Sequence, residues 1–167
     1  MNYFDFFGLP QVWAIDKDKL KKTFYKNSRQ FHPDFHRLSS EDEQAEALEQ
    51  SSHNNRGYKL LMDDHQRLRH LLELEGVLAA EGENTVPQDF LMEIMEVNEL
   101  LMELEFDPDP AAQTKVQALI AELEGGLNSK VADLRESESL NTNDLSQLKD
   151  YYLKHRYLLR LQEKMKS

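Results

Sequence analysis

The chain of 167 residues contains no cysteine. Disulfides are therefore excluded, and so are zinc sites and iron–sulfur clusters held by thiolates. Proline and glycine are scarce, with five and six residues, and β-branched residues are few. Because leucine, glutamate, lysine, glutamine and alanine are abundant, the composition favours helices over strands.

A long apolar run is also missing. No stretch approaches the roughly 20 apolar residues that a membrane span needs. The first five residues have neither the basic segment nor the long apolar core of a signal peptide. We therefore expect a cytoplasmic protein with no membrane partner.

The charge is unevenly distributed. The net charge of −11 argues against a general nucleic-acid binder. Residues 1–80 carry 11 basic and 13 acidic side chains, whereas residues 81–167 carry 9 and 18. This difference indicates two domains with different partners.

Caps and breaks in the first half predict a hairpin of helices. Residues 2–7 favour a short helix, and Asp16 can cap a second helix that runs to about Phe31. Leu20 and Phe24 lie on its apolar face. Pro33 then forces a loop, because the residue before a proline avoids helical geometry.

The next two helices have weaker signals. Residues 40–43, Ser-Glu-Asp-Glu, form a capping box for a third helix. Its expected packing face is only weakly apolar and consists of Ala45, Leu48, Ser52, Asn55, Tyr58 and Leu61 or Met62. Asp63-Asp64 can start a fourth helix, which we expect to extend through Leu78. The two long helices beside Pro33 would then pack antiparallel.

Residues 81–86 predict a linker between an N-terminal domain of residues 1–80 and a C-terminal domain of residues 81–167. Thr85 and Pro87 mark the start of the next helix. Its core seam repeats at intervals of four and three residues, which is typical of a bundle helix. The seam consists of Phe90, Ile94, Val97, Leu101 and Leu104.

Two more amphipathic helices follow. One begins near Ala111, and its apolar residues stay on the same face of the helix as far as Leu134. Gly125-Gly126 lies inside this run and costs about 1 kcal/mol per glycine, but the apolar face continues, so we expect one helix with a soft point. Asn141 or Asn143 caps the last helix. Three such helices with short connections predict an antiparallel bundle, and the whole protein is expected to be all-α.

The tripeptide His32-Pro33-Asp34 carries the main functional signal. A specified tripeptide occurs by chance in such a chain roughly a few times in a hundred, so its context matters. It ends a basic helix and precedes a second long helix, and residues 3–10 read Tyr-Phe-x-x-Phe-Gly-Leu-Pro. This arrangement resembles the J domain, from Tyr3 to about Leu72.

The J-domain family uses this loop and the basic face of the preceding helix to dock on the ATPase domain of a DnaK-class chaperone. Docking promotes ATP hydrolysis by the chaperone. Pro33 would fix a rigid turn and lower the ordering cost on binding, and the basic helix would steer the domain to an acidic surface. The resemblance implies that the chaperone-binding residues are His32, Pro33, Asp34, Lys21, Lys22, Tyr25, Lys26 and Arg29.

The second half of the chain indicates which group of J-domain proteins this sequence resembles. An acidic helical domain follows in place of a Gly/Phe-rich linker or a zinc module, and residues 3–10 and 90–93 are similar to those of the HscB family. That family serves iron–sulfur cluster assembly. The resemblance implies two partners, a chaperone (HscA, or DnaK where HscA is missing) and a scaffold protein of the IscU type. The implied scaffold-binding residues are Leu91, Met92, Met95, Glu96, Glu99, Glu103 and Tyr157.

Two positions depart from the family. Asp63-Asp64 stands where the family usually has Xaa-Pro, and His70 stands where it commonly has tyrosine. Both positions lie outside the loop tripeptide.

A helical wheel supports the scaffold-binding surface independently. At about 100° per residue, Met92 and three glutamates point nearly opposite the apolar seam, and Met95 flanks them. Exposed methionine beside a charged rim suits a protein-binding patch. The alternative is that Met92 and Met95 pack against the J domain.

Two other functions compete with this interpretation. A general J-domain protein would deliver unrelated clients through the same bundle. A metal-binding or catalytic protein would use His32, Asp34 and His36, but no third ligand, nucleophile or phosphate loop accompanies them. We therefore expect no enzymatic activity, no metal and no cofactor.

Overall fold

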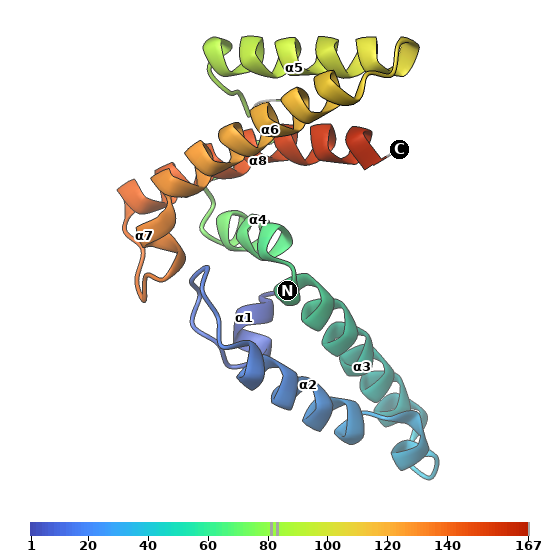
Figure 1. The fold of residues 1–167 in the computed structure, drawn as a ribbon. Helices are drawn as coiled ribbons and strands as arrows, with labels where there is room; N and C mark the ends of the chain where they lie inside the picture. Colours follow the sequence, from blue (N-terminus) through green and yellow to red (C-terminus); the bar gives the residue numbers. More distant parts are fainter. Residues whose placement is uncertain (81, 83, 167) are drawn as a thin grey trace. The chain divides into compact units, whose positions relative to one another are not determined.

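The structure is a computed structural model that describes residues 1–80, 82 and 84–166. These residues form helices and no strand (Figure 1), as the all-α prediction requires. None of the helices in this part of the chain is long and apolar enough to cross a membrane. The helices gather into two compact units. One comprises Met1–Leu74 with Ser137–Ser139, and the other comprises Glu75–Glu136 with Leu140–Ser167.

The domain boundary after residue 80 stays a prediction. The linker predicted at residues 81–86 includes residues 81 and 83, which lie outside the described residues. In the described part, the long segment of the first unit ends at Leu74 and the second unit begins at Glu75.

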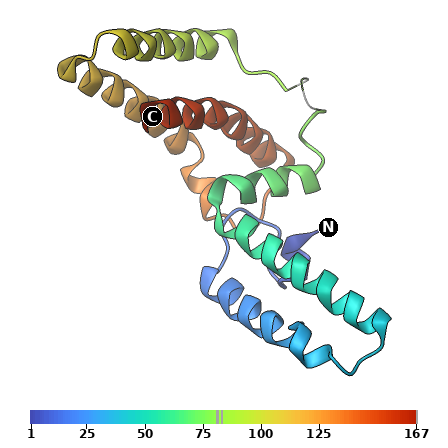
Figure 2. The same ribbon diagram turned by 90° about the vertical axis from the view of Figure 1, so that its right-hand side faces the viewer.

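The N-terminal unit is built on a helical hairpin. Helices α2 (Lys17–Gln30) and α3 (Glu41–Met62) lie side by side, and a short 3-10 helix, η1 (Pro33–His36), occupies the connection (Figure 2). The Asp16 carboxylate caps α2 by accepting from the backbone N–H groups of Asp18 and Lys19. The predicted helices and break are confirmed, and the expected loop contains one turn of 3-10 helix.

Apolar side chains fill the open end of this hairpin, opposite the loop that contains η1. Helix α1 (Tyr3–Phe6) and helix α4 (Asp64–Leu74) both lie there. The fully buried residues of this core are Phe4, Phe7, Trp13, Leu20, Leu61, Leu68, Leu71 and Leu72. Burial of each such aromatic ring or leucine stabilises the fold by about 1.5–3 kcal/mol, so this core holds the short α1 against the longer helices.

The packing face predicted for α3 is confirmed only in part: Leu61 is buried and Ser52 and Tyr58 are half-buried, but Asn55 is exposed. Leu48 is 61% exposed and Ala45 also faces solvent, whereas the buried residues of α3 are Ala47, Asn54, Gly57 and Leu61. The helix approaches its neighbours through small side chains and one buried amide. A search for large apolar side chains at helical spacing therefore finds Leu61 but misses Ala47, Asn54 and Gly57.

Asn54 connects α3 to α2 by three hydrogen bonds. Its amide nitrogen donates to the Phe24 carbonyl at 3.1 Å and to the Ser28 hydroxyl at 3.2 Å. Its amide oxygen accepts from the side chain of Asn27 at 3.2 Å. Since Asn54 is only 1% exposed, these bonds satisfy an amide that would be costly to bury unpaired.

Gly57 marks the closest approach of α3 to α1. A Cβ atom placed on Gly57 would clash with the Tyr3 ring and lie 2.8 Å from the ring of Phe7. We expect Gly57→Ala to lower the stability of the N-terminal unit by about 1–3 kcal/mol, because overpacking forces the rings or the helix to shift. Chemical denaturation followed by the fluorescence of Trp13, the single tryptophan, measures this change. An unchanged midpoint and slope would contradict the close packing.

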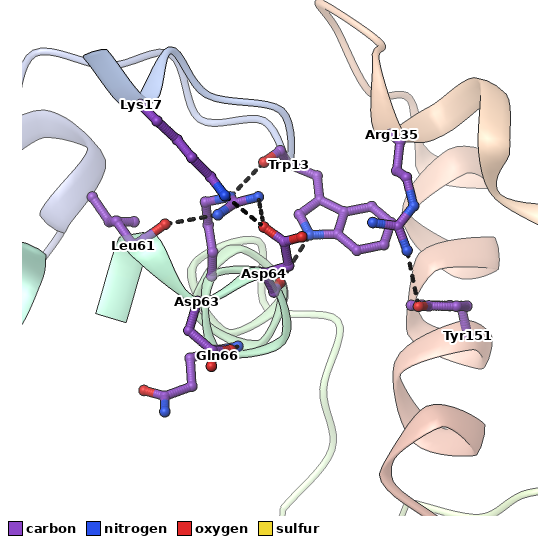
Figure 3. Close-up of polar contacts among 9 residues, drawn as sticks. Trp13, Lys17, Leu61, Asp63, Asp64, Gln66, Arg135 and Tyr151 are labelled. Carbon is purple, nitrogen blue, oxygen red and sulfur yellow. Dashed lines mark hydrogen bonds and ion pairs between the residues drawn. The ribbon is translucent and has the colours of Figure 1, made fainter. Parts of the chain in front are cut away.

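The Asp63-Asp64 pair starts α4 without a proline. The Asp63 carboxylate accepts from the Gln66 N–H at 2.8 Å and so caps the helix. Arg67, which is 5% exposed, donates to the carbonyls of Trp13 at 2.6 Å and Leu61 at 2.7 Å. Figure 3 shows these carbonyls beside Asp64 and Lys17.

Asp64 completes this cluster. Its carboxylate pairs with Arg67 at 2.8 Å and with Lys17 at 3.6 Å, and its backbone carbonyl accepts from the Trp13 indole at 2.9 Å. Aspartate at this position therefore serves the fold directly, by neutralising and satisfying a buried guanidinium.

His70 fastens α1 to α4. Its Nε2 accepts from the backbone N–H of Tyr3 at 3.1 Å, and its ring stacks on Phe4 with centroids 5.6 Å apart. Burial lowers the pKa of this imidazole below its ordinary value of 6.5, which favours the neutral form that can accept this bond.

Helix α4 ends at Leu74, so the predicted extension to Leu78 is wrong. Gly76, with φ of +70°, turns the chain after the helix end.

The C-terminal unit is a three-helix bundle. Helices α5 (Gln88–Phe106), α6 (Pro110–Lys130) and α8 (Thr142–Lys166) contact one another in all three pairs. The predicted seam of α5 is confirmed, since Phe90, Ile94, Val97 and Leu101 are buried and Leu104 is half-buried. The other two helices contribute Val116, Ile120, Leu127, Leu145, Leu148, Tyr151, Tyr152, Leu153, Leu158 and Leu161.

Helix α6 runs unbroken through Gly125-Gly126, as predicted, but it does not reach Leu134. It ends at Lys130, and a separate short helix, α7 (Ala132–Arg135), follows. The side chain of Arg135 donates to the Asn128 side chain at 3.2 Å. It also donates to the Tyr151 hydroxyl at 3.0 Å, as Figure 3 shows. These contacts fix the position of α7 against α6 and α8.

The last helix has a reciprocal cap. The Asn141 side chain accepts from the Asp144 N–H at 2.8 Å, and the Asp144 carboxylate accepts from the Asn141 N–H at 3.0 Å. Of the two asparagines that the sequence left open, Asn141 is therefore the cap.

Two candidate protein-binding surfaces

The tripeptide loop lies at the tip of the α2–α3 hairpin. His32 has an extended backbone with φ of −63° and ψ of 133°, as expected before a proline, and Pro33 occupies the first turn of η1. The Nδ1 atom of His32 accepts from the Asp34 N–H at 3.2 Å. The Asp34 carboxylate accepts from Arg37 at 2.9 Å. These local bonds give the loop one shape.

All three side chains of the tripeptide are exposed. The backbone bond from the Phe35 N–H to the His32 carbonyl, at 3.0 Å, closes the turn beneath them. Nothing in the core depends on the His32 ring or on the Asp34 carboxylate. The loop can therefore present hydrogen-bonding groups to a partner without reorganising the fold.

The basic face of α2 is exposed along the helix that leads to this loop. Lys22 and Lys26 are one turn apart, and Tyr25, which is 52% exposed, lies between them with Lys21 and Arg29 on the same side. The structure thus places the eight predicted chaperone-binding residues on one hairpin, with their side chains available to a partner.

The second surface is the outward side of α5. Met92 and Met95 are 58% and 61% exposed, although methionine is usually buried. The predicted carboxylates Glu96, Glu99 and Glu103 are exposed beside them. The patch therefore combines apolar groups that are free to be buried with carboxylates that attract cations.

The two remaining residues of this surface are half-buried. Leu91 lies on the edge of α5, next to the core residue Phe90. Tyr157 on α8 packs its ring edge-on against Phe90, with centroids 6.0 Å apart, and the Arg160 guanidinium lies 5.5 Å from the Tyr157 ring centroid. The contact with Phe90 brings Tyr157 beside the beginning of α5.

Further exposed apolar side chains accompany both surfaces. On α5, Met102 is 54% and Phe106 is 87% exposed; near the tripeptide, Phe35 is 70% and Leu38 is 103% exposed. Phe106 was not assigned to the patch, although the helical wheel that places Met92 also places Phe106 away from the seam. For Phe35 and Leu38, no periodic pattern gives a signal, because both lie in or beside a short turn.

The histidines of the loop contact the backbone. His36 Nε2 donates to the Gln30 carbonyl at 2.9 Å, and His32 accepts from the Asp34 N–H. Within residues 1–80, 82 and 84–166, no group of three or more histidine, cysteine, aspartate or glutamate side chains is placed to hold a metal ion.

Comparisons with known proteins together extend over nearly the whole chain. The family model described as the HSCB C-terminal oligomerisation domain matches residues 86–166. A co-chaperone protein HscB homolog of Vibrio cholerae is 36% identical over 137 residues, which cover 76% of this chain and 80% of the relative. A homolog of Psychromonas ingrahamii is 29% identical over 164 residues, which cover 97% of this chain and 93% of that protein.

Solved structures agree with these sequences. The crystal structure of human co-chaperone protein HscB matches 99% of this chain and 81% of its own, with a TM-score of 0.80 and 27% identity. The chaperone HscB from Vibrio cholerae matches 99% of this chain and 96% of its own, with a TM-score of 0.74 and 26% identity. The similarity therefore includes both compact units.

Proposed function

Because the chain belongs to the HscB family of co-chaperones, we propose that it binds a DnaK-class chaperone through the tripeptide loop and an iron–sulfur scaffold protein through α5. As a J-domain co-chaperone of iron–sulfur cluster assembly, it would deliver the scaffold to the chaperone and stimulate the chaperone's ATPase. The chaperone would be HscA or DnaK, and the scaffold would be of the IscU type. A cytoplasmic location, as the sequence predicts, is part of the proposal.

The observation that carries this proposal is the exposed tripeptide that follows the basic helix α2 at the tip of the hairpin. His32, Pro33 and Asp34 are held in a fixed turn by local hydrogen bonds, and none of them is needed by the core. A preformed loop loses little conformational freedom on binding, so more of its contact energy remains as affinity. The chemistry of ATP hydrolysis would belong to the chaperone, and this chain would act without being an enzyme.

The acidic patch on α5 supports the second partner. Met92 and Met95 offer an apolar centre, and the surrounding carboxylates would favour a scaffold surface that carries lysine or arginine. The tripeptide and the patch belong to different compact units. One molecule could therefore hold both partners through separate surfaces.

The test measures ATP hydrolysis by a purified DnaK-class chaperone in four mixtures: alone, with this protein, with the scaffold, and with both. The proposal requires stimulation by this protein alone and a further increase when the scaffold is added. Calorimetric titration of this protein with the scaffold tests the second contact directly. Stimulation without any scaffold binding would favour a general J-domain protein that serves other clients.

Chaperone docking is expected to depend on the basic face of α2. Replacing Lys22 and Lys26 by glutamate should slow association by about tenfold at low salt and should change dissociation less, because these exposed charges act mainly by steering. Surface plasmon resonance at several salt concentrations measures both rates. For the unaltered protein, association should slow as salt screens charges beyond roughly 8–10 Å. An association rate that does not vary with salt would contradict electrostatic docking.

A further inference from the structure

A groove of about 490 Å³ lies between α5 and α6 in the C-terminal unit. Its apolar lining includes Val97 and Leu100 of α5 and Leu119, Leu123 and Leu127 of α6. Four acidic residues also line it, and all four are exposed: Asp89, Glu93, Glu96 and Glu122. An apolar floor with carboxylate rims is suited to a ligand that is both apolar and basic.

Two lysines lie among these lining residues. Lys154 already pairs with Asp150 at 3.0 Å, and its ammonium lies 5.7 Å from the centre of the Phe90 ring. Its side chain is only 12% exposed. Lys130 is exposed at the end of α6. The four carboxylates therefore outnumber the cations that remain accessible, and the groove attracts positive charge.

Gly126 keeps the α6 side of the groove open. A Cβ atom added to Gly126 would meet no heavy atom within 4 Å, so packing within the chain does not require glycine there. Glycine inside a helix costs about 1 kcal/mol relative to alanine. Without a side chain at this position, another chain can approach the backbone of α6 closely.

We propose that this groove takes an amphipathic helix of the iron–sulfur scaffold protein, with its apolar side against the leucines and its basic residues against the carboxylate rims. Such a helix matches the groove in shape and in charge. The scaffold is the occupant because Glu96 belongs both to the groove and to the outward patch on α5. One bound protein would therefore cover two adjoining sides of α5. The inference rests on the proposed function and adds a second contact to it.

A matched pair of glycine variants tests the groove. Gly126→Leu places a large side chain in the groove, whereas Gly125→Leu places the same side chain on α6 outside it. Both variants replace a helical glycine with a good helix former in open space, so both should fold. In calorimetric titration with the purified scaffold, we expect Gly126→Leu to weaken binding by at least about tenfold. Gly125→Leu should bind within about twofold of the unaltered protein.

A second pair of variants tests the charges. Glu93→Gln with Glu122→Gln removes two groove carboxylates, and Asp133→Asn with Glu163→Gln removes two exposed carboxylates elsewhere. The first pair should weaken scaffold binding severalfold more than the second at low salt, and the difference should shrink as salt is raised. If Gly126→Leu does not fold, this comparison still tests whether the scaffold binds in the groove.

The outcomes separate this inference from the proposed function. If the unaltered protein binds the scaffold and Met92→Ala with Met95→Ala weakens that binding, while neither groove variant differs from its control, the groove proposal alone is overturned. If the unaltered protein does not bind the scaffold at all, the proposed function and the groove proposal are both overturned.

Discussion

Replacing His32 by glutamine is expected to abolish stimulation of the chaperone ATPase while the protein stays folded. The imidazole lies on the exposed tip of the hairpin, and its only described polar partners are the backbone and carboxylate of Asp34. A polar exchange at such a site should change stability by less than about 0.5 kcal/mol. Glutamine cannot place a ring nitrogen at the same position, so the docking geometry is lost.

Single-turnover ATP hydrolysis by a DnaK-class chaperone measures this loss. His36→Gln is the matched control, because it removes the same ring from the same turn but leaves the tripeptide intact. Circular dichroism should give the same helix content for both variants. If His32→Gln stimulates the ATPase as well as the unaltered protein does, the tripeptide is not the contact that triggers hydrolysis.

The double replacement Met92→Ala with Met95→Ala is expected to cost about 2 kcal/mol or more in scaffold binding. Truncating an apolar anchor at the centre of an interface has effects of this size, whereas rim charges usually contribute less. Glu96→Lys or Glu99→Lys should therefore weaken binding by a smaller amount. The seam of α5 points to the other side of the helix, so the bundle should keep its core.

Two measurements complete this prediction. Calorimetric titration against the scaffold gives the loss of affinity, and ATPase stimulation without scaffold should persist because the hairpin is unchanged. Leu48→Ala removes an equally exposed apolar side chain from the other unit and should leave scaffold binding unaltered. A well-folded double variant that binds the scaffold normally would place the scaffold site elsewhere and would favour packing of these methionines against the J domain.

The contrast between α5 and α3 explains how far the sequence could predict this fold. In α5 the core side chains are large and apolar, so their spacing identified both the buried seam and the exposed methionines on the other side. In α3 the buried side includes Gly57 and Asn54, and their burial depends on ring and backbone groups far away in the sequence. Local periodicity contains no information about such partners.

Helix ends show a similar division. Asp16 and Ser40 cap their helices by bonds to residues two or three positions ahead, so the sequence alone predicted these starts. The end of α6 was not predicted, because it involves a contact from Arg135 to Tyr151 on another helix. The acidic groove was missed for the same reason, since it exists only when α5 and α6 pack together.

The buried amide of Asn54 also fixes the alignment of the hairpin. It forms hydrogen bonds to two successive turns of α2, with the carbonyl of Phe24 and with the side chains of Asn27 and Ser28. If α3 slid by one helical turn, about 5.4 Å, the donor and acceptor of this amide would lose their partners, at a cost of about 1–3 kcal/mol each. In a hairpin held by leucines alone, the same shift of α3 would cost less free energy, because apolar contacts are not directional. The alignment of α3 with α2 is thus set by a side chain that lies out of reach of any partner.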